Sequence, residues 1–318
     1  MQTLFVVLPM MLATSFAYQN VNPLRSLPFR CSSQTLQKSR STLFNNVFPV
    51  NSVHHGFHYS RELQKLRPKS FFEGWYYRMS VPETKSSQML DVVLVTCIQR
   101  TKHNGDYLVS LQTIINNGED DVYLLRSQTH NSSTINGIFS ASFQQNHHSY
   151  RINFDDNNSS FVDVSFDSND NSVGTISGYI PSLFVNDAST VLKQTPPGTD
   201  SLNFTFPVTV KNKWGSGKEC IPTSGWISKL SRVTLFDPHW QVLSSRGSVD
   251  AGFNFDWKRG GSTMRALSKT KENITNTKFY AEKNWGVLGF PPVWFWVQAN
   301  QFNSHDSLAV TIGGGEVS

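Results

Sequence analysis

A period-two alternation of apolar and polar side chains runs through the middle of this chain and narrows its possible folds more than any other feature. Phe204, Phe206 and Val208 alternate with Thr or Pro, and segments 150–155 and 162–167 alternate in the same way. Because successive side chains of a β-strand point to opposite faces, this pattern predicts strands with one buried face. An amphipathic helix would instead repeat its apolar positions every three to four residues.

Further strands and their turns complete an all-β pattern. The aliphatic segments 90–98 and 107–115 predict two more strands, and Asn-Gly pairs at 104–105, 117–118 and 136–137 favour tight hairpin turns. No segment shows a sustained helical period with caps, so we expect few helices. The predicted fold class is all-β, an antiparallel barrel or sandwich with an aromatic interior.

The composition fits a protein that encloses an apolar ligand. Aromatic residues make up 13% of the 318 residues, a length sufficient for a large core or for two domains. The formal net charge is +5, but part of this excess precedes the first acidic residue, Glu62, so it does not indicate nucleic-acid binding. The three cysteines, Cys31, Cys97 and Cys220, make neither a disulfide framework nor a metal cluster.

The N-terminal region has the composition of a targeting leader. Residues 1–15 contain a short apolar run followed by small residues, as in a signal peptide, although no Lys or Arg precedes the run. Residues 16–52 are Ser-rich, basic and free of acidic residues, which is typical of a disordered transit peptide. A signal followed by a transit sequence resembles bipartite leaders that target plastids enclosed by the endomembrane system. We therefore expect plastid import, with secretion as the alternative.

Two aromatic stretches contain charged residues whose placement must be explained. Segment 279–302 combines three Trp with Glu282 and Lys283, and segment 71–78 places Glu73 before three aromatic residues. Aromatic surface is costly to leave in water, so these rings belong in a core or line an apolar pocket. A charge buried beside them is costly unless it is paired or has a chemical task, so both stretches are candidates for an active site.

The same two stretches also suggest an internal similarity. An aromatic strand, a polar gap and an aliphatic strand occur near 75–95 and again near 294–312. This favours a first β domain over 53–278 and a second, similar unit over 279–318 that is incomplete in this chain. The alternative is that the last strands close the first barrel.

Several motifs together resemble the tocopherol cyclase family. They are 71–78 (FFEGWYYR), 224–226 (SGW), 236–241 (FDPHWQ), 282–286 (EKNWG), 294–298 (WFWVQ) and 313–315 (GGG), in family order. The segment 55–58 (HGFH) is similar to the entry motif of the family with its first residue changed. The resemblance extends from about residue 54 to the end.

The resemblance implies a plastid enzyme of vitamin E biosynthesis, associated with a membrane or plastoglobule surface, that closes a prenylated benzoquinol to a chromanol. It also implies a lipocalin-like double barrel and a reaction without a redox cofactor or metal. Ring closure needs a proton on the trisubstituted alkene of the prenyl chain, and the neighbouring phenol oxygen then traps the tertiary cation. A carboxyl whose pKa is raised by apolar surroundings could hold that proton, and Glu282 and Glu73 fit this role.

The candidate site residues follow from these motifs. The catalytic candidates are Glu282, which we favour, Glu73, Asp237 and His239. The candidate substrate-binding residues supply rings for the cation or polar groups for the hydroquinone hydroxyls: Trp75, Tyr76, Trp240, Lys283, Asn284, Trp285, Trp294, Trp296 and Gln298.

Each candidate also has a structural interpretation. Glu282 and Lys283 would form a solvated surface pair, and Glu73 would hold its own turn or pair with Arg78. A lone His such as His239 is more often structural than catalytic. The Lys and Arg side chains of the strands are expected to point outward.

Two other functions stay open. One is a non-catalytic carrier of prenylquinones or carotenoids, which would leave Glu73 and Glu282 facing solvent. The other is a hydratase of a prenyl double bond, in which water replaces the phenol. In every case the partner is a lipophilic small molecule and not a nucleic acid.

Overall fold

The all-β class is confirmed by a computed structural model of the chain. The structure describes residues 5–6, 71–82, 89–100, 106–116, 121–130, 138–144, 147–167, 172–187, 200–211, 239–268, 277–286, 294–299 and 309–315. Within this part of the chain, no helix has the length and apolar character needed to cross a membrane.

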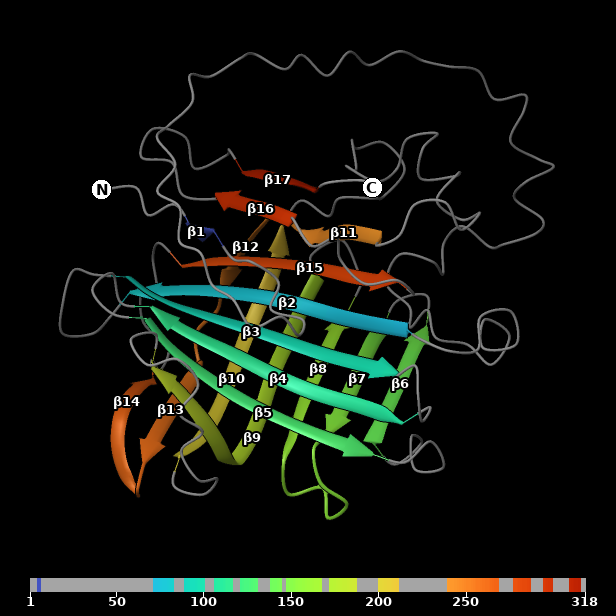
Figure 1. The fold of residues 1–318 in the computed structure, drawn as a ribbon. Helices are drawn as coiled ribbons and strands as arrows, with labels where there is room; N and C mark the ends of the chain where they lie inside the picture. The colour runs from blue at the N-terminus through green and yellow to red at the C-terminus, as the bar shows by residue number, and fades with distance from the viewer. Residues whose placement is uncertain are drawn as a thin grey trace, which may run out of the picture.

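Most strands belong to one 14-stranded antiparallel sheet (Figure 1). Its main path is β11 (His239–Ser244), β15 (Lys278–Gly286), β2 (Phe71–Pro82), β3 (Met89–Arg100), β4 (Tyr107–Asn116), β5 (Asp121–His130), β9 (Ser172–Asp187), β10 (Asp200–Lys211), β13 (Asn254–Arg259) and β14 (Ser262–Ser268). A branch of β6 (Phe139–Gln144), β7 (His147–Asn153) and β8 (Phe161–Asp167) joins β9, and β12 (Arg246–Val249) pairs with β10. The strands predicted from alternation at 162–167 and 204–210 fall within β8 and β10, and the one predicted at 150–155 overlaps β7, which ends at Asn153.

Strand β9 connects two layers of this sheet. Its C-terminal part pairs with β5, its N-terminal part pairs with β8, and β10 runs beside most of its length. In Figure 1 the strands β2 to β5 cross in front of β6 to β10. One long strand shared by two layers therefore folds the sheet over on itself, and no pairing among the described residues joins the end strands β11 and β14.

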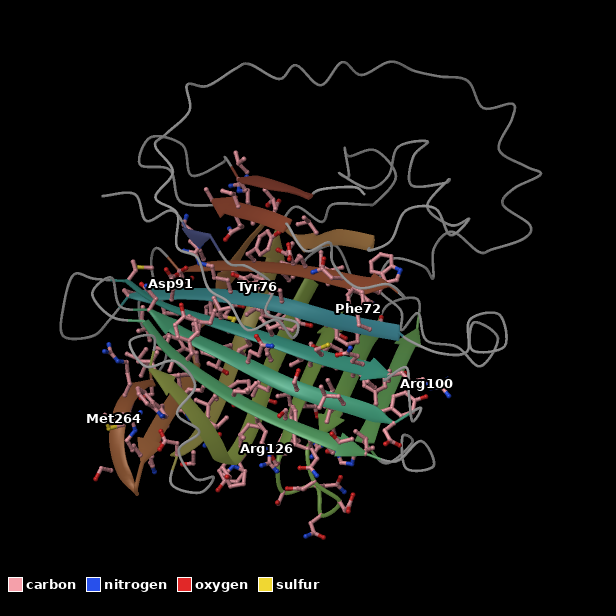
Figure 2. The ribbon with its side chains drawn as sticks, viewed as in Figure 1. Phe72, Tyr76, Asp91, Arg100, Arg126 and Met264 are labelled. Carbon is pink, nitrogen blue, oxygen red and sulfur yellow. The ribbon has the colours of Figure 1, made fainter. Side chains whose placement is uncertain are left out.

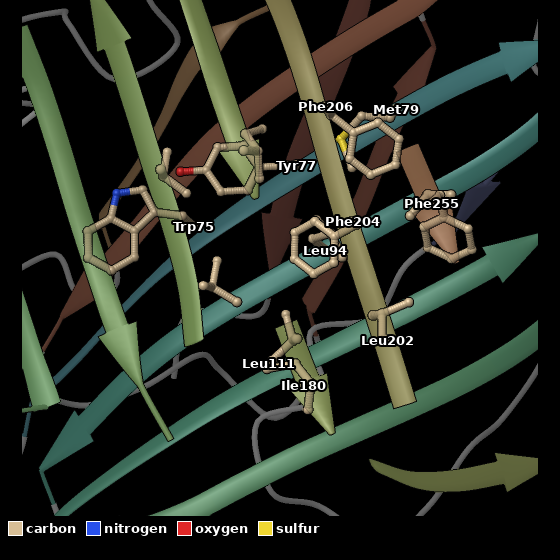
Figure 3. Packing of buried hydrophobic residues seen from close by; sticks show 14 of the residues in the cluster. Trp75, Tyr77, Met79, Leu94, Leu111, Ile180, Leu202, Phe204, Phe206 and Phe255 are labelled. Atoms are coloured by element: carbon tan, nitrogen blue, oxygen red, sulfur yellow. The ribbon is translucent and has the colours of Figure 1, made fainter. Parts of the chain in front are cut away.

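The core fills the space between the crossing layers (Figure 3). Tyr77 and Met79 of β2 and Phe204 and Phe206 of β10 are buried members of this one core. The rings of Phe206 and Phe255 lie 6.2 Å apart between centroids. Each such side chain stabilises the fold by roughly 1.5–3 kcal/mol relative to exposure, which explains the alternation seen in the sequence.

Strand β2 is buried on both faces, because a second sheet lies against its outer face. This small sheet consists of β1 (Phe5–Val6), β16 (Trp294–Ala299) and β17 (Val310–Gly315). Arg78 of β2 donates from Nη1 to Oε1 of Gln298 on β16 at 2.8 Å. Figure 1 shows β16 and β17 beside β15, away from β5.

The structure bears on two expectations about the ends of the chain. Phe5 and Val6 of the expected signal peptide pair with β16, so they are exceptions to the expected absence of stable structure. The other residues up to 52 lie outside the described part.

The expected start of a second unit at 279 falls inside β15, which pairs along its whole length with β2. The division into two units stays a prediction.

Candidate functional site

The register of β2 against β15 places the predicted site residues on two opposite faces of one strand pair. Trp75 lies opposite Lys283, and Tyr76 lies opposite Glu282. Because side chains alternate along a strand, odd-numbered residues of both strands face the core and even-numbered residues face β16. We call Glu73, Trp75, Lys283 and Trp285 the inner cluster. Tyr76, Tyr280, Glu282 and Asn284 form the outer cluster.

The inner cluster is a buried ion pair between indole rings. The ammonium of Lys283 contacts the carboxylate of Glu73, and both side chains are 0% exposed. Lys283 Nζ also lies 4.9 Å from the ring centroid of Trp75 and 5.7 Å from that of Trp285, within the range of cation–π attraction. Burial lowers the pKa of Lys283, and the nearby Glu73 opposes this shift.

Packed aromatic residues close the inner cluster on its core side. Trp75 stacks on Tyr150 of β7 with 4.3 Å between ring centroids. The Tyr150 hydroxyl bonds with those of Tyr77 at 2.8 Å and Thr96 at 2.9 Å. Burial raises the pKa of both phenols. Stacked rings and hydrogen bonds between neutral hydroxyls therefore connect the two layers at this point.

The outer cluster holds a carboxyl that hydrogen-bonding groups surround. Glu282 is 5% exposed. Its Oε2 accepts from the Tyr280 hydroxyl at 2.7 Å, and its Oε1 accepts from Asn284 Nδ2 at 3.2 Å. Burial raises the pKa of Tyr280, and the charge of Glu282 raises it further, so this phenol stays a donor at neutral pH.

Two more groups of this face stay uncharged at neutral pH. The ring of Tyr76 meets that of Tyr280 edge to face, with 6.0 Å between centroids. Burial raises the pKa of the Tyr76 phenol and of the Cys97 thiol, the latter to about 12. Cys97 is therefore a poor nucleophile at neutral pH, because only the thiolate reacts readily.

A charged network joins the outer face of β2 to β16. Arg78 donates to both carboxylate oxygens of Asp91, from Nε at 3.2 Å and from Nη2 at 3.0 Å, and Ser80 also donates to Asp91. Arg78 also donates to Gln298, which is 1% exposed. The Nε2 atom of Gln298 is buried without a hydrogen-bond partner among the described residues. Figure 2 marks Tyr76 and Asp91 on β2 and β3.

The structural interpretations of the charged residues are wrong in three respects. Glu282 and Lys283 do not form a surface pair, because adjacent residues of a strand point to opposite faces. Glu73 pairs with Lys283 rather than with Arg78, which binds Asp91. Lys283 and Arg78 do not point outward: each is buried because a carboxylate neutralises it on its own face.

Other predicted residues can be placed only by their backbone. His239 and Trp240 begin β11 and lie opposite Trp285 and Asn284 of β15. Trp294 and Trp296 lie on β16, in the small sheet. The side chains of these four residues and the whole of Asp237 lie outside the described part, so their roles stay predictions.

Sequence reasoning missed two residues of the outer face, Tyr280 and Asp91, and the role of Arg78. Tyr280 could have been found, because it precedes Glu282 by two residues and so shares its face. Asp91 has no such local signal, because β2–β3 pairing brings it opposite Ser80.

Comparison with known proteins identifies the family. The model of the family described as tocopherol cyclase-like matches residues 69–318. The chain belongs to this family. It is 24% identical over 285 residues to a protein of Oryza sativa subsp. japonica named probable tocopherol cyclase, chloroplastic. It is also 24% identical over 298 residues to a tocopherol cyclase, chloroplastic, of Zea mays.

The match to these relatives is partial. Each alignment covers 84% of this chain and 53% of the relative. The chain therefore spans about half the length of the curated tocopherol cyclases it matches. Both clusters lie inside the region that the tocopherol cyclase-like model covers.

Proposed function

We propose that this chain closes a prenylated benzoquinol to a chromanol and that Glu282 delivers the proton. The observation that carries the proposal is the outer cluster. This cluster holds the buried carboxyl of Glu282, which accepts hydrogen bonds from Tyr280 and Asn284. On the same side of β2, the buried amide of Gln298 has an N–H without a hydrogen-bond partner among the described residues. Membership of the tocopherol cyclase-like family supports the reaction class.

The proposed reaction is balanced without an oxidant or reductant. The O–H bond of a protonated Glu282 breaks as its proton forms a C–H bond at the less substituted alkene carbon. Positive charge develops on the tertiary carbon, and the phenol oxygen attacks it to form the C–O bond. The phenol proton returns to the carboxylate, so the product is an isomer of the substrate.

The outer cluster contains groups that stabilise the charges formed at each stage of the proposed reaction. The Tyr280 hydroxyl hydrogen-bonds to Glu282 more strongly as its carboxyl becomes negative, because hydrogen bonds to ions are stronger than those to neutral groups. The electron-rich faces of Tyr76 and Tyr280 attract a nearby cation. A dry surface also keeps water from trapping the cation before the phenol does.

The inner cluster is a less suitable proton source. Lys283 already lies against the indole rings and already neutralises Glu73, and stacked core residues enclose both. A substrate would have to displace a paired charge from a close-packed interior, which is costly. We therefore assign the inner cluster to stability.

The two alternative functions make different predictions. A carrier was expected to leave both glutamates facing solvent, whereas Glu73 is 0% and Glu282 is 5% exposed. A hydratase would share the protonation step and differ only in the trap. The products separate these functions: a chromanol, a tertiary alcohol or an unchanged bound ligand.

The decisive experiment is incubation of the full chain in deuterated water with phytyl- and geranylgeranyl-benzoquinol. We expect a chromanol that carries one solvent deuterium on the ring CH2 next to the tertiary carbon. A tertiary alcohol would identify a hydratase. Tight binding without conversion by a folded protein would identify a carrier.

We also propose that the protein acts in the plastid, where the names of its relatives place them. A fluorescent protein fused behind residues 1–52 should reach the plastid. Appearance of this fusion in the medium would contradict the proposal and favour secretion.

A further inference from the structure

The outer face contains a hydrogen-bond donor that the fold does not use. Gln298 is 1% exposed, and its Nε2 atom has no partner among the described residues. A buried amide without a partner destabilises the fold, because it has given up its hydrogen bonds to water and gained none in return. Such groups are rare in folded proteins, and one beside a proposed active site points to a ligand.

The orientation of this amide is fixed by its neighbour. Arg78 has donors only, so the Gln298 atom that faces it at 2.8 Å must be the oxygen. Arg78 is itself held by Asp91 through two hydrogen bonds. The Nε2 group therefore points away from Arg78 and can only donate.

Gln298 and Glu282 contact neighbouring residues of the outer face. Gln298 bonds to Arg78, and Arg78 lies opposite Tyr280 in the β2–β15 register. Tyr280 in turn donates to Glu282, two residues further along β15. Gln298 therefore belongs to the same face of the strand pair as the proposed acid.

We infer that Gln298 Nε2 donates a hydrogen bond to the ring oxygen para to the oxygen that closes the chromanol. This inference rests on the proposed function and adds a ligand class to it. A donor does not distinguish a hydroxyl oxygen from a carbonyl oxygen, since both accept. The site therefore also binds the oxidised prenyl-benzoquinone, which has no phenol and cannot close.

The test compares two ligands on two proteins. The first ligand is a prenyl-1,4-benzoquinone, whose binding is measured by its quenching of tryptophan fluorescence. The second is a prenylphenol with the same tail but no para oxygen, whose binding is measured by its displacement of the quinone. The wild-type protein should bind the quinone about 10- to 100-fold more tightly than the phenol, the range expected for one buried hydrogen bond.

The informative variant is Gln298→Glu. The carboxylate keeps an acceptor toward Arg78 but has no N–H to donate. It should weaken quinone binding about 10- to 100-fold and leave phenol binding unchanged. Equal weakening of both ligands would assign Gln298 a structural role and overturn the inference, as would equal affinity of the wild-type protein for both. If this variant does not fold, the wild-type comparison alone decides.

This design can reject the role of Gln298 and the proposed reaction independently of each other. If the quinone pattern holds and no chromanol forms, the proposed reaction is wrong and the ligand site stands. If chromanol forms and the para oxygen makes no difference to binding, the reaction stands and the role of Gln298 is wrong.

Discussion

The two faces of the β2–β15 strand pair each bury one glutamate, and they hold it in different ways. On the inner face, Glu73 is neutralised by Lys283 within a close-packed aromatic core. On the outer face, neutral donors, Tyr280 and Asn284, hold Glu282. An ion pair stabilises charge that is already present, whereas neutral donors can respond to charge that develops during a reaction. The same two strands thus separate a stabilising site from a proposed reactive one.

Removing the proposed acid should have the largest effect. Glu282→Gln preserves shape but cannot deliver a proton, so turnover of benzoquinol to chromanol should fall by about two to four orders of magnitude. Binding of the prenyl-benzoquinone should stay near normal. Glu73→Gln should cost less turnover per folded molecule.

The opposite outcome would reverse the comparison. If Glu282→Gln keeps its turnover while Glu73→Gln or Asp237→Asn loses it, the acid lies at the residue whose variant is inactive. If all three variants stay active, a carboxyl acid is excluded and His239 becomes the next donor to test.

Breaking the inner ion pair should affect stability more than chemistry. Glu73→Gln leaves the ammonium of Lys283 buried without its carboxylate, which should lower the free energy of unfolding by about 3–5 kcal/mol in urea denaturation. Asp163→Asn is a matched control, because its pair with Arg151 is partly exposed. It should cost less than about 1 kcal/mol.

Replacing both Glu73 and Lys283 tests further whether the inner ion pair serves stability rather than chemistry. The double variant Glu73→Leu with Lys283→Met removes both charges and keeps apolar volume, so it should recover most of the stability lost by Glu73→Gln. If it folds and is inactive while Glu282 is intact, the inner pair takes part in the reaction.

Two Tyr→Phe variants test one hydroxyl on each face. Tyr280→Phe removes a donor to Glu282 and should reduce turnover about 10- to 100-fold. Tyr77→Phe removes the hydroxyl that bonds to Tyr150 and should cost about 1 kcal/mol of unfolding free energy with turnover unchanged. Equal turnover of the two variants would remove the distinction between the faces.

The same two phenols should also lower the stability of the protein in alkaline solution. Burial raises the pKa of Tyr77 and Tyr280 above 10, the value of an unfolded tyrosine. Above pH 10 the unfolded chain loses these protons first, so stability present below pH 10 declines by up to about 1.4 kcal/mol per pH unit for each group. Either Phe variant should make the decline between pH 10 and 11 shallower in urea denaturation. A steeper decline would contradict the burial of these phenols.

The titration of Lys283 should change the stability of the protein in the opposite direction as pH rises. Its pKa is lowered in the folded state, so the folded protein releases this proton before the unfolded chain does. Its contribution to stability therefore rises as pH increases toward 10.5. Lys283→Met should remove this rise and make the alkaline decline steeper. An unchanged decline would show that Lys283 keeps an ordinary pKa, and a shallower one that its pKa is raised; either would contradict the prediction.

The sequence alone determined the local structure and the identity of the important stretches. Alternation predicted β7, β8 and β10, because the side-chain period of a strand is a local property. The motifs at 71–78 and 282–286 singled out Glu73 and Glu282, since a carboxylate among aromatic residues is unusual at any position. Alternation also implies that Glu282 and Lys283 face opposite ways, once the segment is known to be a strand.

Only the tertiary structure decided which partner each charge has. Glu73 meets Lys283 because β15 pairs with β2 in one particular register, and a shift by one residue would exchange the two faces. Gln298 meets Arg78 across 220 positions of sequence because the small sheet covers the outer face of β2. Pairing between distant strands depends on the packing of whole faces, which no short stretch of sequence encodes.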